Sequence, residues 1–130
     1  MHVEELSRLA VDALEDIKAR DIVVLDVKRM NSLFDHVIVA TADSARQTKS
    51  LAHHVQEKLK GLGATVIGVE GLETGEWVLV DLGDVVVHIM QPAIRDYYNL
   101  EELWGGQRPA FRPSTASARL ADYPADEARV

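Results

Sequence analysis

Residues 77–90, WVLVDLGDVVVHIM, contain two mainly apolar runs of six residues separated by a Gly-Asp pair. Such a pair favours a two-residue hairpin turn, because the primed turns that join paired strands need a positive φ angle. Side chains alternate between the two faces of a strand. Val78, Val80 and Leu82 therefore share one face, which Val87 and Ile89 continue on the second strand. We expect this aliphatic face to lie against the core.

The opposite face of the predicted hairpin carries a mixture of side chains, namely Trp77, Leu79, Asp81, His88 and Met90. Tryptophan is a frequent anchor in protein interfaces, and methionine adapts its shape to partners. One interpretation is therefore a partner-binding surface. The other is that the C-terminal helices cover this face and bury Trp77, and that His88 finds its hydrogen-bond partners inside the protein. The pattern alone does not choose between them.

The rest of the chain predicts an α/β fold around this hairpin. Apolar residues at helical spacing and short β-branched runs give predicted helices at 3–20, 45–60, 93–98 and 100–104 and predicted strands at 22–27, 36–41, 64–69, 77–82 and 85–90. Asp43 or Ser44 can cap the second helix. The helix between the second and third strands suggests a parallel crossover. We expect a mixed five-stranded sheet with packed helices.

Length and composition indicate one domain with a tail. The chain has 130 residues, a length typical of a single domain. Residues 105–130 hold three of the four prolines together with Ser, Thr, Ala and Arg. Such a segment buries too little apolar surface to offset its loss of conformational entropy. We therefore predict a folded domain over 1–104 and a disordered tail over 105–130.

The charge distribution narrows the class of partner. The net charge is −7, and no Lys or Arg occurs between Lys60 and Arg95, a stretch with five acidic residues. A general nucleic-acid binder needs a basic footprint, so we expect no direct DNA binding. The sequence also lacks a long apolar run or a signal peptide, which predicts a cytoplasmic protein with no membrane contact.

The residues give little support for catalysis or for a cofactor. The absence of cysteine excludes a thiolate zinc site, an iron–sulfur cluster and a cysteine nucleophile. No Gly-x-Ser-x-Gly motif is present, and Ser44 fits best as a helix cap. Asp81 and Asp84 flank a turn and are better explained as solvated acids than as metal ligands. We therefore expect no catalytic residue, no metal and no cofactor.

Several segments, taken in order, resemble one known family. These are DHVIVAT at 35–41, SARQ at 44–47, Trp77, VDLGDVVVHIM at 80–90, and the Tyr-x-Leu-Glu-x-Leu-Trp pattern at 98–104. The chain is similar to the ribosomal silencing factor (RsfS, or Iojap) family over about residues 3–104. The block that runs from Trp77 to His88 is its most specific part.

The resemblance implies a function and a fold. It implies binding to the large ribosomal subunit through ribosomal protein uL14, steric blocking of small-subunit association, and repression of translation under nutrient limitation. It also implies a nucleotidyltransferase-like fold, a homodimer when free, and no enzymatic activity. The residues themselves suggest where such a partner would bind. We expect apolar contacts from Trp77, Leu82 and Met90, polar contacts from Asp81, Asp84 and His88, and Tyr98 (or its neighbour Tyr97) at the rim. The alternative is a nucleotidyltransferase-like enzyme, although the Gly-Ser turn and clustered acids of that chemistry are missing.

Overall fold

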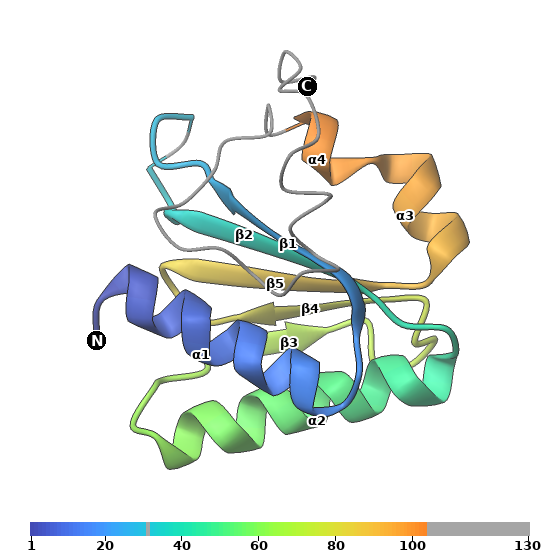
Figure 1. Cartoon of the computed structure of the whole chain (residues 1–130), viewed down its shortest axis with the longest axis horizontal. Helices are drawn as coiled ribbons and strands as arrows, with labels where there is room; N and C mark the ends of the chain where they lie inside the picture. Colours follow the sequence, from blue (N-terminus) through green and yellow to red (C-terminus); the bar gives the residue numbers. More distant parts are fainter. Residues whose placement is uncertain (31, 104–130) are drawn as a thin grey trace.

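The computed structural model describes residues 1–30 and 32–103 as a five-stranded sheet with helices on both faces (Figure 1). The helices are α1 (Val3–Asp16), α2 (Ala45–Gly61), α3 (Pro92–Tyr98) and α4 (Leu100–Leu103). The strands are β1 (Arg20–Asp26), β2 (His36–Thr41), β3 (Gly68–Glu70), β4 (Trp77–Asp81) and β5 (Val85–Met90). The α/β class and the five-stranded mixed sheet are confirmed. The tail prediction for 105–130 lies outside the described residues, and the likeness to nucleotidyltransferases stays a prediction.

The predicted hairpin forms the β4–β5 pair. Trp77 lies opposite Met90 and Asp81 opposite Val86, and the Leu82 amide donates to the Val85 carbonyl across the turn at 2.9 Å. Gly83 has a φ angle of 91°, whereas Asp84 is not among the residues with positive φ. That combination is the type II′ turn, whose first central position suits glycine.

The crossover through α2 is parallel, as predicted, but it does not join neighbouring strands. The sheet order is β1-β2-β5-β4-β3, in which only β2 and β5 form a parallel pair. The α2 connection therefore passes over β5 and β4 to reach β3 at the far edge. β5 is buried at every position except His88, whereas the three-residue β3 is at most half-buried. A strand that is apolar on both faces gains most from a central position covered by helices on both sides.

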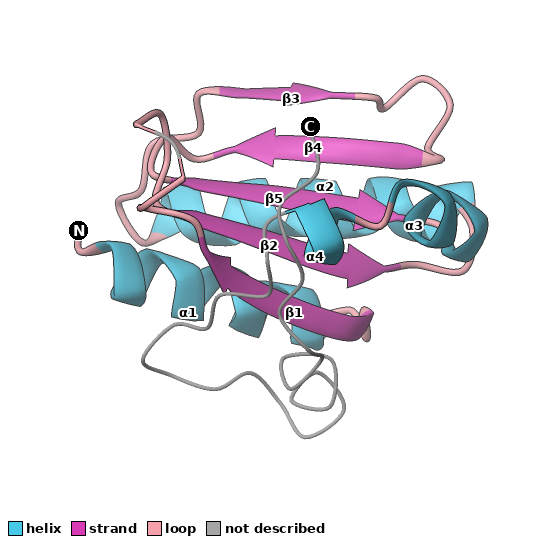
Figure 2. Cartoon of the chain, turned by 90° about the horizontal axis from the view of Figure 1, so that it is seen from above, coloured by secondary structure: helices cyan, strands magenta, loops and turns pink. Residues whose placement is uncertain are grey.

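The helices divide the core into two layers (Figures 1 and 2). α1 and α2 cover one face of the sheet, where Leu14 and Leu51 pack with Val80 and Ile89. α3 and α4 lie on the other face, where the buried members of the cluster are Val23, Leu25, Val27, Val37, Val39, Met90 and Leu100. Within the described part of the chain, no helix combines the length and hydrophobicity needed to cross a membrane.

Some element boundaries differ from the predicted ones. α1 ends at Asp16 instead of residue 20, because Lys18 adopts a left-handed φ angle of 61° in the turn that leads to β1. Asp21 also has a left-handed φ angle, of 50°, where the register of β1 against β2 shifts. The third strand is shorter than predicted and covers only Gly68–Glu70. Ser44 is the residue that caps α2, since its side-chain oxygen accepts from the Gln47 amide at 3.0 Å.

Candidate functional site

The helices α3 and α4 cover only part of the sheet face opposite α1 and α2 (Figure 2). Leu100 is buried against Val37 and Met90, and Ile94 packs on the same cluster. Next to them, over β4 and β5, an open groove of about 720 Å³ remains. We call it the sheet groove. The structure therefore combines the two sequence interpretations, since the helices bury one portion of this face and leave another open.

The sheet groove has an apolar floor. Six hydrophobic side chains line it: Leu33, Phe34, Ile67, Leu79, Val86 and Leu100. Two of these are strongly exposed, with 79% of Leu33 and 64% of Ile67 accessible to solvent. Exposed aliphatic side chains around a concave surface are typical of a site that another molecule covers.

Acidic side chains give the sheet groove a negative charge. Glu70 ends β3, Asp81 ends β4, and Asp84 lies in the turn between β4 and β5. The described residues that line the groove include no Lys or Arg. Asp81 Oδ1 accepts from the Gly83 amide at 2.9 Å, which holds this carboxylate beside the turn. The groove therefore complements a positively charged partner.

An aromatic row borders the sheet groove on the side of α3. Trp77 Nε1 donates to His88 Nδ1 at 2.9 Å, and the two rings lie 5.8 Å apart between centroids. The Trp77 ring also contacts Tyr98 at 4.7 Å, and Tyr98 contacts Tyr97 at 5.0 Å. Trp77 is half-buried, whereas the two tyrosines are exposed. Burial lowers the pKa of His88 to about 4, so its imidazole is neutral at pH 7.

Two of the seven predicted contact residues are not available at this surface. Met90 is completely buried in the core beneath α3 and α4. Leu82 is 5% exposed and packs on the opposite face with the core under α1 and α2. Strand alternation explains the position of Leu82, since it continues the aliphatic face of Val78 and Val80. The remaining predicted residues lie on one side of the sheet: Trp77, Asp81, Asp84, His88 and Tyr98.

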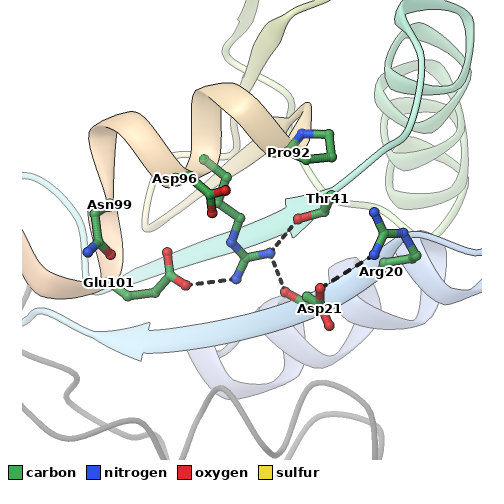
Figure 3. Close-up of a pocket in the computed structure, with 8 residues that line it drawn as sticks. Arg20, Asp21, Thr41, Pro92, Asp96, Asn99 and Glu101 are labelled. Atoms are coloured by element: carbon green, nitrogen blue, oxygen red, sulfur yellow. Dashed lines mark hydrogen bonds and ion pairs between the residues drawn. The ribbon is translucent and has the colours of Figure 1, made fainter.

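Arg95 is a structurally important residue that the sequence reasoning missed. Its guanidinium donates to the Asp21 carbonyl at 2.5 Å, to Thr41 Oγ1 at 2.7 Å and to the Glu101 carboxylate at 2.9 Å. Figure 3 shows Asp21, Thr41 and Glu101 converging on one guanidinium beside a cavity of about 300 Å³. These bonds tie α3 to β1, β2 and α4.

The position of α3 therefore depends on Arg95, and so does that of Tyr98. Arg95 is 7% exposed; its charge is paired with Glu101, and its other two acceptors are distant in the sequence. In the sequence, an arginine on a short, polar helix is indistinguishable from a solvated one. Its ion-pair partner Glu101 is six residues away. Side chains that meet on one helix face are three or four residues apart, so this spacing did not predict the pair.

A second buried histidine lies on the other side of the sheet, away from the groove. His36 Nδ1 and Ser7 Oγ lie 2.6 Å apart between β2 and α1, and both residues are buried. The Nε2 atom of His36 is also buried and has no hydrogen-bond partner. Burial lowers the pKa of His36. The pair fastens α1 to the sheet and takes no part in the candidate surface.

Comparisons with known proteins agree on one family. Residues 1–129 match the family described as "Ribosomal silencing factor during starvation". A ribosomal silencing factor from Chromobacterium violaceum is 59% identical over 89% of this chain and 95% of its own length. A crystal structure of a protein from Chromobacterium violaceum, 57% identical, superposes with a TM-score of 0.80 over 92% of this chain and 99% of the other.

A more distant relative has a name that refers to the ribosome. It is the mouse protein "Mitochondrial assembly of ribosomal large subunit protein 1". It is 30% identical over 74% of this chain, and the match covers 43% of the mouse protein.

Proposed function

The chain belongs to the ribosomal silencing factor family, and from this premise we propose that it binds the large ribosomal subunit through ribosomal protein uL14. Occupation of that site blocks association with the small subunit and represses translation under nutrient limitation. The mechanism is steric, so no bond is made or broken. An interface of ordinary size, about 800 Å² per partner, is enough to exclude a competing surface.

The observation that carries this proposal is the acidic sheet groove. Its apolar floor, its three carboxylates and the exposed tyrosines beside it form a surface that complements a basic protein. The same surface repels RNA phosphates, so the proposed contact is with a protein of the ribosome. The name of the mouse relative refers to the large ribosomal subunit, which supports the choice of subunit.

The proposed contact residues are those that the structure leaves accessible, namely Trp77, Asp81, Asp84, His88 and Tyr98. We further propose that the free protein is a cytoplasmic homodimer, that residues 1–104 form its domain, and that 105–130 are a tail. The enzyme alternative gains no support from the geometry. Within residues 1–30 and 32–103, no three His, Asp or Glu side chains come together as a potential metal site.

Sedimentation with purified large subunits tests the proposal. The full-length chain is expected to co-migrate with large subunits through a density gradient and to reduce the yield of joined ribosomes when small subunits are added. Failure to co-migrate even at low salt would exclude the proposal.

A matched pair of charge reversals tests the surface. Asp81→Lys places a positive charge in the sheet groove and is expected to weaken binding at least tenfold, because like charges at an interface cost roughly 1.4 kcal/mol or more. Glu57→Lys makes the same charge change on the exposed face of α2 and is expected to bind as the wild type does. Equal effects of the two changes would show that net charge matters and the groove does not.

A further inference from the structure

We infer that the Trp77–His88 pair presents a fixed hydrogen-bond donor, the Nε2–H of a neutral imidazole, to a carbonyl oxygen of the protein that occupies the sheet groove. The inference rests on the proposed function, because it describes how that partner is recognised. It assigns Trp77 a second role, as a positioning residue that acts through His88.

The tautomer of His88 follows from the chemistry of its neighbour. The indole N–H can only donate a hydrogen bond, and Trp77 Nε1 lies 2.9 Å from His88 Nδ1. Nδ1 must therefore accept and cannot carry a proton. A neutral imidazole has one N–H, which is then on Nε2. A protonated His88 would have donors on both nitrogens and would lose the Trp77 bond.

The Nε2 atom is open to the sheet groove. His88 lines the groove, and Nε2 lies at the end of the ring far from Cβ. The described residues contain three buried side-chain atoms without a partner, in Glu15, His36 and Glu101. Nε2 of His88 is not one of them, and no hydrogen bond joins it to another described residue. The groove therefore offers an unused donor above its apolar floor.

The charges around His88 determine which acceptor suits this donor. Glu70, Asp81 and Asp84 line the same groove, and the ring of Tyr98 contacts Trp77. An anionic acceptor such as a phosphate or carboxylate oxygen would be repelled by the three acids. A neutral carbonyl oxygen is not repelled, and a Lys or Arg close to it would be attracted. The geometry therefore favours a carbonyl in a basic protein segment over the backbone of RNA.

Trp77 is well suited to hold the imidazole in place. Trp77 is half-buried, and its ring contacts those of His88 and Tyr98 at centroid distances of 5.8 Å and 4.7 Å. Phenylalanine at this position would preserve an aromatic contact and remove the N–H donor. His88 could then place its proton on either nitrogen, and the donor in the groove would be present only part of the time.

Nuclear magnetic resonance of the free, nitrogen-15-labelled full chain tests the tautomer without any partner. Two-bond nitrogen–proton correlations are expected to show the Nε2–H tautomer of His88 throughout pH 6 to 8. Trp77→Phe is expected to give a mixture of tautomers and a higher His88 pKa. Detection of Nδ1–H as the main tautomer in the wild type would overturn the inference.

Binding to purified large subunits tests the donor itself. His88→Asn keeps an acceptor near the Nδ1 position but has no group at Nε2, and it is expected to bind roughly 5- to 10-fold more weakly. His88→Gln places an amide N–H near the Nε2 position and is expected to recover most of the affinity. The control is His53→Asn on the exposed face of α2, which is expected to have no effect.

The results separate this inference from the proposed function. If the wild type binds large subunits and His88→Asn binds equally well with a folded spectrum, the inference is wrong and the proposed function stands. If the wild type does not bind, the proposed function is wrong, whatever tautomer His88 adopts. If protein-free ribosomal RNA competes with the subunits for the groove, the acceptor is not the carbonyl of a protein and the inference fails.

Discussion

Replacement of Arg95 by alanine is expected to destabilise the fold strongly, because Arg95 links α3 to two strands and α4. The change removes three hydrogen bonds and leaves the Glu101 carboxylate, only 12% exposed, without its cation. Removing one partner of a buried ion pair costs about 3–5 kcal/mol. Water can enter from the adjacent cavity of about 300 Å³ and solvate the carboxylate. We therefore expect the low end of that range, about 3 kcal/mol.

Equilibrium unfolding in urea measures this loss. With a slope of about 1.5 kcal/mol per molar urea, typical of small domains, the midpoint is expected to fall by about 2 M. Arg95→Lys is expected to recover little, because a single ammonium cannot serve three acceptors as a planar guanidinium does. Arg46→Ala, at an exposed position in the first turn of α2, is the control and is expected to shift the midpoint by less than about 0.5 M.

A double-mutant cycle decides whether the ion pair is the cause. Glu101→Gln removes the buried charge, so Arg95→Ala is expected to cost at least about 1 kcal/mol less in that background than in the wild type. A loss below about 1 kcal/mol for Arg95→Ala, or perfect additivity with Glu101→Gln, would refute the reasoning.

Two other changes test the energetics of the fold. The pKa of His88 is about 4 in the folded protein against an ordinary 6.5, and burial also lowers the pKa of His36, so the unfolded chain takes up protons at a higher pH than the folded chain does. The free energy of unfolding is therefore expected to be largest above about pH 6.5 and to fall towards pH 4, by about 3 kcal/mol for His88 alone. Urea unfolding at several pH values measures this change. An unchanged midpoint between pH 7 and 4.5 would contradict this. Gly71 has a φ angle of 92° and a Cβ there would collide with the Trp77 carbonyl, so Gly71→Ala is expected to lower thermal stability by about 2 kcal/mol or more. Gly61→Ala, where a Cβ meets open space at the end of α2, is expected to have no cost, and equal melting temperatures for the two variants would contradict the clash.

Much of the local structure, and which face of the 77–90 hairpin packs on the core, could be predicted from short stretches of sequence. The alternation in residues 77–90 correctly predicted the hairpin, its turn at Gly83 and the aliphatic face that packs under α1 and α2. The boundaries of β2 and the Ser44 cap of α2 were also correct. These features depend on side chains a few residues apart, so their physical causes are contained in short stretches of sequence.

Apart from the β4–β5 hairpin, the order of the strands in the sheet depends on the tertiary structure. The sequence order suggested that β2 crosses over to β3, and the directions are indeed parallel, but β5 inserts beside β2. Periodicity reports which side of a strand is apolar and carries no information on which other strand shares its hydrogen bonds. The insertion of β5 is a property of the whole sheet, in which the most apolar strand gains most from the centre.

The same distinction applies to the candidate site. The pattern selected the mixed face and its acids, but it also selected Met90, which α3 and α4 bury, and Leu82, which faces the other layer. It missed Arg95, whose acceptors at Asp21 and Thr41 are 74 and 54 residues away in the chain. Burial and long-range hydrogen bonds depend on which elements pack together. The sequence therefore determined which side chains this face carries, and only the packing of α3 and α4 decided which of them a partner can reach.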